Sequence, residues 1–367
     1  MTVPSTLAAA QHAPRPLPLF LHMLRSETHG DPVRRAAALA GLQAYQAAPR
    51  SPRPAPMPVI ATAGRASLRD YGGAPDGAPV VFVPSLINPP FVLDLAPDAS
   101  LLRWLAARGH RAMLVDWGTP TAADREQDIA AHVETMLLPM LRTLRHPPIL
   151  AGYCLGGTIA LAAAQRLPAA GLILLAAPWR FAAFGDEARA GIVGHWERAA
   201  SACETLGLVP MEVLQAVFWG LDPARTIAKF EAFAALDPAG AKAAAFVALE
   251  DWANAGAPLS LAAGRDLFTR LFGADDPGRA AWAVAGAVID PALLTCPVLD
   301  IVSTRDRIVP AASSAAIGTR IAVDAGHVGM VVGSRARSLV WEPLADWLTA
   351  TAAIREPAGK HIRSPRS

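Results

Sequence analysis

Short apolar runs alternate with helical stretches between residues 79 and 179. The runs have the length and the β-branched content of buried strands, and they lie at 79–84 (PVVFVP), 111–118, 147–154 and 171–178. The segments between them carry apolar residues at helical spacing, at 98–109, 125–144 and 155–167. Strands that alternate with helices predict a mostly parallel sheet covered by helices on both faces.

The alternation stops after residue 179 and returns near residue 290. The intervening stretch is rich in alanine and tryptophan and has helical periodicity, which indicates a helical cap inserted between two halves of one sheet. The chain is therefore divided into a Pro/Arg-rich N-terminal arm around one short helix (1–57), the first half of the core (58–182), the cap (183–289), the second half of the core (290–352) and a flexible basic tail (353–367).

The amino-acid composition excludes several classes of protein. Hydrophobic residues make up 53% of the chain and charged residues 17%, as in a globular protein. The formal net charge is only +2 and the basic residues are scattered, which argues against a nucleic-acid partner. No apolar run reaches the roughly 20 residues of a transmembrane helix, residues 1–20 lack the pattern of a signal peptide, and three cysteines are too few for a disulfide framework or a metal cluster. We therefore expect a cytoplasmic protein without a metal site.

The segment GYCLGGT at 152–158 follows the apolar run at 149–151 and opens a helical stretch. A small residue, any residue, a nucleophile, any residue and a glycine form a nucleophile elbow, in which the middle residue is normally serine. Glycines are needed because a strand that turns sharply into a helix leaves no room for bulky neighbours. The pattern predicts an α/β-hydrolase fold with Cys154 as the nucleophile, and a buried inert cysteine is the alternative.

A nucleophile elbow needs a base and an acid, in the chain order nucleophile, acid, histidine. His327 follows the apolar run IAVDAG and is the histidine placed at a strand end. Asp306 ends the run LDIVSTR and is the preferred acid. Asp300, in the middle of a strand, and Asp324, on the strand that leads to His327, are the weaker alternatives.

The remaining candidate residues would contact the substrate. Two backbone N–H groups should stabilise an oxyanion, one from Leu155 and one from Leu86 or Ile87, between which the sequence does not decide. Asn88, Asp116, Trp117 and Trp252 are candidate substrate contacts. For each of these four, turn capping, loop hydrogen bonding or core packing is the alternative.

Five segments of the chain resemble the poly(3-hydroxyalkanoate) synthases, and most of all their short two-subunit class. The segments lie within residues 79–179 and 290–350 and read VFVPSLINPPFVLDLAPDASLLRWLAARGH, MLVDWGTP, GYCLGGT, TCPVLDIVSTRDRIVP and AGHVGMVVGS. The resemblance implies that Cys154 carries the acyl group, that His327 is the base and that Asp306 is the third member. Two features differ from the family: Arg307 follows the acid, where such synthases usually have histidine, and the cap around 248–272 matches only loosely.

A cysteine nucleophile suits acyl transfer, because a thiolate that attacks a coenzyme A thioester gives another thioester at nearly equal energy. The resemblance implies an acyltransferase that polymerises (R)-3-hydroxyacyl-CoA into polyhydroxyalkanoate and releases CoA, with the CoA thioester as substrate and no cofactor. Its expected partners are the acyl-CoA and the growing polyester, with either a second synthase subunit or a homodimer left open. The surface of polymer granules is a further expected location. The alternative function is an esterase, thioesterase or polyester depolymerase with the same three residues.

Overall fold

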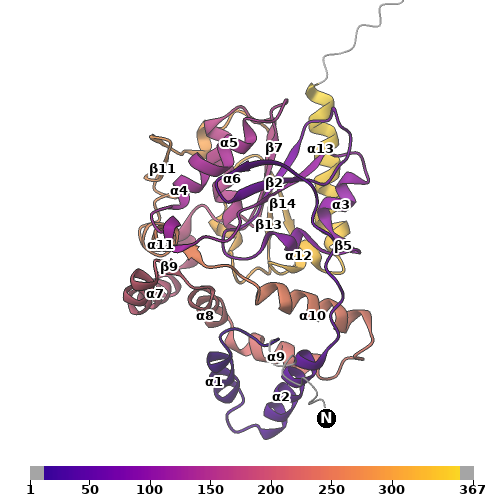
Figure 1. The fold of residues 1–367 in the computed structure, drawn as a ribbon, viewed down its shortest axis with the longest axis vertical. Helices are drawn as coiled ribbons and strands as arrows, with labels where there is room; N and C mark the ends of the chain where they lie inside the picture. Colours follow the sequence, from indigo (N-terminus) through magenta and orange to yellow (C-terminus); the bar gives the residue numbers. More distant parts are fainter. Residues whose placement is uncertain (1–11, 356–367) are drawn as a thin grey trace, which may run out of the picture.

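An eight-stranded sheet forms the centre of the molecule, which a computed structural model describes for residues 12–355 (Figure 1). In spatial order its strands are β1 (Val59–Ala63), β2 (Ala66–Asp70), β6 (Ala112–Asp116), β3 (Val80–Val83), β7 (Ile149–Tyr153), β8 (Gly171–Leu175), β13 (Val298–Ser303) and β14 (Thr319–Val323). β2 runs antiparallel to both of its neighbours, and the pairs from β6 to β14 are all parallel. The predicted mostly parallel sheet is confirmed.

Helices cover both faces of this sheet. Alternate residues of β3 belong to different hydrophobic cores, Val81 and Val83 to one and Val80 and Phe82 to the other, because successive side chains of a strand point to opposite faces. α6 (Leu155–Arg166) packs in the first core, and α3 (Leu101–Ala106) and α13 (Glu342–Arg355) pack in the second. This layering, together with the elbow described below, confirms the α/β-hydrolase fold.

Two helices of the core differ from their predicted form. α3 begins after Ser100, whose side chain accepts from the N–H of Arg103, and not at Asp98. The predicted helix 125–144 is interrupted: α4 (Ile129–Ala131) and α5 (Leu138–Leu141) are joined by a π-helix at His132–Leu137. A wider turn just before Pro139 fits the missing N–H of that residue, which cannot continue an α-helical ladder.

The cap contains five α-helices and two short pairs of strands. The helices are α7 (Asp186–Leu206), α8 (Met211–Leu221), α9 (Pro223–Phe233), α10 (Ala241–Ala253) and α11 (Leu261–Arg265), and a π-helix at Asp266–Gly273 continues α11. β9 (Leu208–Val209) pairs antiparallel with β10 (Leu259–Ser260), and β11 (Ala283–Val284) forms a hairpin with β12 (Ala287–Val288). α8, α9 and α10 lie beyond one end of the sheet (Figure 1). The limits 183 and 289 of the cap stay predictions.

The N-terminal segment holds two helices where one short helix in an extended arm was predicted. α1 (Leu17–Glu27) and α2 (Pro32–Ala47) pack on α9 of the cap and share a separate hydrophobic core with it, in which Phe20, Tyr45 and Phe230 are buried (Figure 1). The prediction rested on the Pro- and Arg-rich composition of residues 1–57, which gave too little weight to the helical stretches between the prolines. Asp31 followed by Pro32 was the available signal, since Asp31 caps α2 by accepting from the N–H of Arg34.

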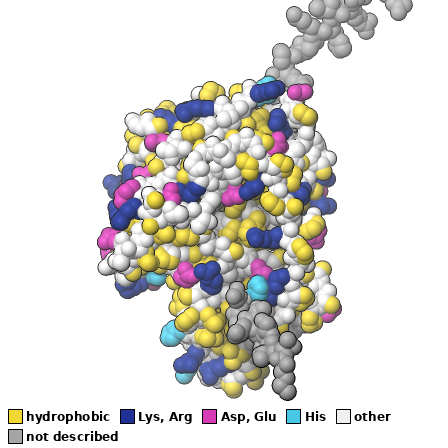
Figure 2. All heavy atoms as spheres, viewed as in Figure 1, with side chains coloured by type: hydrophobic (Ala, Val, Ile, Leu, Met, Phe, Trp, Pro, Cys, Tyr) yellow, Lys and Arg dark blue, Asp and Glu magenta, His cyan; other side chains and the backbone are white. Residues whose placement is uncertain are grey.

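Three smaller elements lie outside the large sheet and the cap. β4 (Asp94–Ala96) pairs with β5 (Ala99–Ser100), and α12 (Gly329–Val332) follows β14. On the face shown in Figure 2, basic and acidic side chains are interspersed and form no single basic patch. Within residues 12–355, no helix has the length and apolar character needed to cross a membrane. The predicted tail lies outside the described residues, apart from 353–355 at the end of α13.

Candidate active site

Cys154 lies at a strained turn between β7 and α6. Its φ of 56° and ψ of −133° are unusual for a residue with a side chain, and such strain is typical of a nucleophile elbow. The neighbouring glycines are needed for close packing: a Cβ on Gly156 would lie 2.1 Å from the carbonyl oxygen of Val83, and one on Gly152 would lie 2.3 Å from Cα of Gly157. The half-buried thiol therefore lies at the carboxyl end of β7, at the start of α6.

His327 and Asp306 are in direct contact. Nδ1 of His327 donates to Oδ2 of Asp306 at 2.5 Å, and both side chains are almost completely buried. The other oxygen of Asp306 accepts from the N–H groups of Ile308 at 2.7 Å and Val309 at 2.9 Å. These two bonds fix the carboxylate, and the carboxylate in turn fixes the tautomer and the orientation of the imidazole.

The imidazole is also held from the side of β7. The ring of Tyr153 stacks on His327 with 5.0 Å between ring centroids, and the Tyr153 hydroxyl donates to the backbone oxygen of His327 at 3.1 Å. Cys154 and this imidazole line the same cavity. Burial by itself lowers the pKa of His327, but the negative charges of Cys154 and Asp306 and the hydrogen bonds to them outweigh it and raise this pKa to about 10. The site therefore favours a protonated imidazole at neutral pH.

The two alternative acids have other contacts. Asp300 is fully buried in β13 and accepts from Arg320 at 2.7 Å and from Ser314 at 2.5 Å. Asp324 is exposed and lies 3.7 Å from Arg305. Of the three aspartates considered, Asp306 is the one that contacts His327.

The backbone donors expected around an oxyanion are placed as follows. Leu155 is the first residue of α6, directly after Cys154. The N–H of Ile87 donates to Oγ of Ser85 at 3.2 Å, whereas no hydrogen bond from the N–H of Leu86 is found within residues 12–355. Of the two candidates that the sequence left open, Leu86 is thus the one whose donor is available to a substrate.

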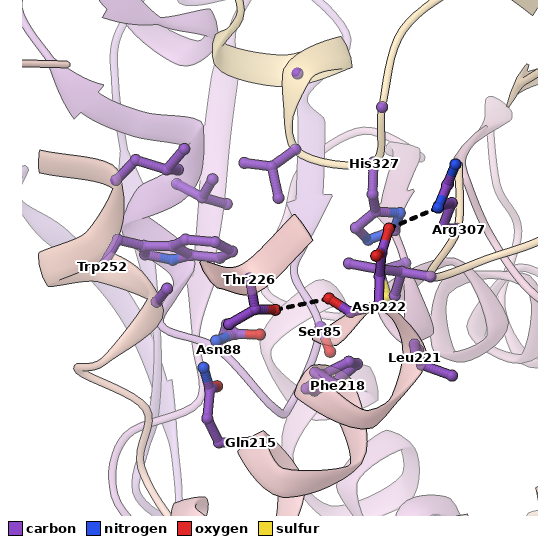
Figure 3. A pocket seen from close by; sticks show the side chains of 18 of the residues that line it. Ser85, Asn88, Gln215, Phe218, Leu221, Asp222, Thr226, Trp252, Arg307 and His327 are labelled. Atoms are coloured by element: carbon purple, nitrogen blue, oxygen red, sulfur yellow. Dashed lines mark hydrogen bonds and ion pairs between the residues drawn. The ribbon is translucent and has the colours of Figure 1, made fainter. Parts of the chain in front are cut away.

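A cavity of about 430 Å³ opens above Cys154 and His327 (Figure 3). Three parts of the chain line it: the loop after β3 with Ser85 and Asn88, the cap helices α8 to α10, and the loops that follow β13 and β14. Trp252, at the end of α10, lines the cavity and donates from Nε1 to the carbonyl oxygen of Pro89 at 2.8 Å. The structure thus brings Asn88 and Trp252 to the same cavity as Cys154.

Asp116 and Trp117 do not line this cavity. Asp116 pairs with Arg69 at 3.0 Å and accepts from the N–H of Gly118, so it holds the turn after β6. Trp117 is buried and donates to the carbonyl oxygen of Pro84 at 3.0 Å. A strand end and the match to the family made both residues candidates, with turn capping and packing as the other interpretation, and their contacts in the structure are of this second kind.

The cap contributes residues that the sequence did not single out. Gln215 and Phe218 of α8 line the cavity, as do Asp222, which caps α9, and the pair Lys229–Glu250, joined at 2.7 Å. Arg307 donates to Asp222 at 2.7 Å and so links the loop of Asp306 to the cap (Figure 3). One signal was available for Gln215, since it is a lone amide inside the apolar run of α8.

A second, smaller cavity of about 50 Å³ lies on the other side of Cys154. Its lining is almost wholly apolar and comes from the elbow, α8 and the segments around Phe181 and Phe268. Cys154 and Phe218 belong to the linings of both cavities. The nucleophile therefore separates a large cavity with polar groups from a small apolar one.

The chain is similar to curated poly(3-hydroxyalkanoate) polymerase subunits, although no family model matches it. It is 26% identical over 297 residues to the subunit of Allochromatium vinosum, which covers 75% of this chain and 82% of that protein. It is 24% identical over 292 residues to that of Haloferax mediterranei, covering 73% of this chain. The chain spans 58% and 65% of the lengths of the relatives from Haloferax mediterranei and Haloarcula marismortui. The resemblance predicted from the motifs is confirmed.

Two solved structures are similar in shape. An esterase of Thermogutta terrifontis covers 82% of this chain over its full length, with a TM-score of 0.45 and 20% identity. A monoacylglycerol lipase of Paleococcus ferrophilus covers 78% over its full length, with a TM-score of 0.49 and 14% identity. The fold assignment rests on the sheet order and on the elbow of this chain.

Proposed function

From the similarity to poly(3-hydroxyalkanoate) polymerases and the arrangement at the elbow, we propose that this chain is a cysteine acyltransferase that polymerises (R)-3-hydroxyacyl groups from CoA thioesters. The observation that carries the proposal is a buried His327–Asp306 pair that lines the same cavity as a cysteine at the nucleophile position. These residues would act as a Cys154–His327–Asp306 triad.

In the first half-reaction, His327 takes the proton of the Cys154 thiol and Asp306 stabilises the imidazolium. The thiolate attacks the carbonyl carbon of the acyl-CoA, and the N–H groups of Leu155 and Leu86 stabilise the oxyanion. When the tetrahedral intermediate collapses, the bond from carbon to the CoA sulfur breaks and the leaving thiolate takes the proton from His327. The product is an acyl group in thioester linkage to Cys154, at nearly the energy of the substrate.

In the second half-reaction, His327 removes the proton of a chain-end hydroxyl, which attacks the acyl-enzyme carbonyl. An ester bond forms, the bond to the Cys154 sulfur breaks, and the sulfur recovers its proton from His327. The chain grows by one unit at each cycle. A hydroxyl instead of water must reach the thioester, and the cap over the cavity, with Phe218 and Trp252 in its lining, favours that outcome by limiting water.

The proposed reaction uses the CoA thioester as substrate and needs no cofactor, because three side chains supply the nucleophile, the base and its orienting acid. Its partners would be the acyl-CoA and the growing polyester. We propose the cytoplasm and the polymer surface as its location. A second synthase subunit or a second copy of this chain would be a further partner, and gel filtration of the pure protein with and without substrate tests the second copy.

The experiment that tests this function measures CoA release from (R)-3-hydroxybutyryl-CoA and from a longer (R)-3-hydroxyacyl-CoA, with the products sized in the same reaction. Cys154→Ala should abolish release, whereas Cys296→Ala, at a half-buried cysteine that lines neither cavity beside Cys154, should retain it. High-mass polyester supports the polymerase. Free acid as the sole product would instead establish a thioesterase, esterase or depolymerase, and release that survives Cys154→Ala would contradict both.

A further inference from the structure

The two cavities that meet at Cys154 differ in chemistry. The smaller one is lined almost entirely by aliphatic and phenylalanine side chains, whereas the larger one contains the side chains of Ser85, Asn88 and Gln215 among its apolar groups. A thioester bound at Cys154 has an acyl part on one side of the reacting carbon and a thiol part on the other. The difference between the cavities indicates which part each one accepts.

Gln215 is the most informative polar residue in this region. It lies on α8 and is only 8% exposed, between Leu214 and Phe218, which face the small cavity. No hydrogen bond from its carboxamide to any of residues 12–355 is found, although it lines the large cavity (Figure 3). The polar atoms of this amide are not fully buried but open to the cavity, so they are available to a ligand there.

Asn88 faces the same cavity from the core side, on the loop after β3. Its carboxamide likewise has no hydrogen bond to the described residues, and in Figure 3 it extends into the same space as the Gln215 carboxamide. Each carboxamide offers a donor and an acceptor. Together they match a ligand group that also donates and accepts, such as a secondary amide, better than an ester, which only accepts.

The rim of the large cavity carries a surplus of positive charge. Arg307 is paired with Asp222 and Lys229 with Glu250, but within residues 12–353 no carboxylate pairs with Arg225, and Arg305 has only an exposed contact at 3.7 Å. Nη2 of Arg225 would lie 3.8 Å from a Cβ on Gly326, so this guanidinium is next to the loop of His327. This excess of positive charge at the rim favours a substrate whose thiol part ends in an anionic group.

We propose that Gln215 and Asn88 bind the amide of the thiol part of the thioester substrate, that is, the amide two methylene groups from the sulfur in a pantetheine arm. The acyl alkyl group then occupies the small apolar cavity. This inference rests on the proposed function and specifies how its site distinguishes a pantetheine thioester from a simple alkyl thioester. Gln215 and Asn88 take no part in bond breaking and act through binding alone.

The test compares two thioesters of one (R)-3-hydroxy acid, the N-acetylcysteamine thioester and the S-pentyl thioester, which has the same chain length without the amide. Gln215→Met removes the carboxamide and keeps the volume. We expect this substitution to lower kcat/KM about 10-fold for the N-acetylcysteamine thioester, the effect of one lost hydrogen bond, and less than 2-fold for the S-pentyl thioester. Asn88→Leu should show the same selectivity. It replaces Gln215→Met as the test variant if Gln215→Met does not fold.

A control separates recognition from repacking. Thr226→Val changes a hydroxyl of the same cavity that donates to the backbone oxygen of Asp222, and it should alter both thioesters to the same degree. Equal losses for both substrates in Gln215→Met and Asn88→Leu, or no loss for either, would overturn the inference. Failure of the proposed function looks different, because then neither thioester would be cleaved in a Cys154-dependent reaction.

Discussion

One carboxylate oxygen of Asp306 accepts from His327, and the other accepts from two backbone N–H groups of its own loop. Because the loop fixes the carboxylate, Asp306 can hold the imidazole in one orientation. The order of nucleophile, acid and histidine along the chain selected Cys154, Asp306 and His327, because strand ends of a parallel sheet meet at one edge, and the structure brings Asp306 and His327 into contact. For Asp116 and Trp117 the sequence left a substrate contact and a capped turn with a packed tryptophan open, and their contacts match the second. A strand end fixes the edge of the sheet but not the direction of a side chain, and Arg69 and Pro84 bind these two locally.

At this scale we predict that Asp306→Asn lowers the pKa of His327 from about 10, since the carboxylate that raises it is lost while burial, which lowers it, remains. The protonated fraction of His327 would then fall at lower pH. The measurement is an NMR titration of the imidazole. CoA release should also fall by at least about 100-fold, as for other orienting acids.

Asp324→Asn is the control, because this aspartate is exposed and contacts arginines rather than His327. An imidazole titration in Asp306→Asn that matches the unchanged protein would contradict the prediction. The raised pKa of His327 also makes the stability of the fold depend on pH. Protonated His327 stabilises the fold fully below the unfolded value near 6.5, and this contribution is lost as the pH rises toward 10.

At the scale of elements, the parallel strands of the sheet were predicted well, whereas β1 and β2 were not predicted and the helices were predicted less well. Continuous apolar runs identified β3, β6, β7, β8 and β13. A strand that is buried on both faces is apolar at nearly every position, so its sequence reads as one unbroken apolar run. The helix before the elbow was predicted as one piece, although Pro139 and the π-helix at His132–Leu137 divide it. Periodicity shows which face is apolar and does not show how the backbone accommodates a proline.

For the elbow we predict that Gly156→Ala destabilises the fold by about 3 kcal/mol, since the new Cβ would overlap the carbonyl oxygen of Val83 at a rigid strand end. Denaturant unfolding measures this change. Gly191→Ala is the matched control, in the middle of α7 with nothing within 4 Å of the new Cβ. It should stabilise the protein by about 0.5–1 kcal/mol. Equal effects of the two substitutions would refute the role of close packing at the elbow.

At the scale of the whole molecule, the N-terminal helices belong with the cap. Arg34 pairs with Glu231 of α9, and Tyr45 donates to Asp251 of α10, directly before Trp252. The positions of Gln215 and Trp252 in the cavity therefore depend on α1 and α2 as well as on the cap. Sequence could not show this arrangement, because the contacts join segments about 200 residues apart and leave no local pattern.

We predict that Phe20→Ala loosens this N-terminal and cap unit before the sheet. Phe20 is fully buried between Trp219 and Phe230, so its loss should cost about 3 kcal/mol. Hydrogen exchange should then quicken in α1, α2 and α9 and stay slow in β3 and β7. Leu21→Ala is the control on the same helix, at a residue that is 40% exposed, and it should change little. Uniform quickening in all elements would show that cap and sheet open together.

The docking of α2 on α9 also has a consequence for synthesis. The ribosome completes α2 at residue 47 and α9 only at residue 233, which is 186 residues later. Translation adds about 5–20 residues per second, so the apolar face around Phe20 and Tyr45 stays without α9 for roughly 10–40 s. During that interval the nascent chain exposes a surface that chaperones bind. Ribosome-bound chains stopped before residue 223 should therefore retain such chaperones, and chains stopped well past residue 233 should release them.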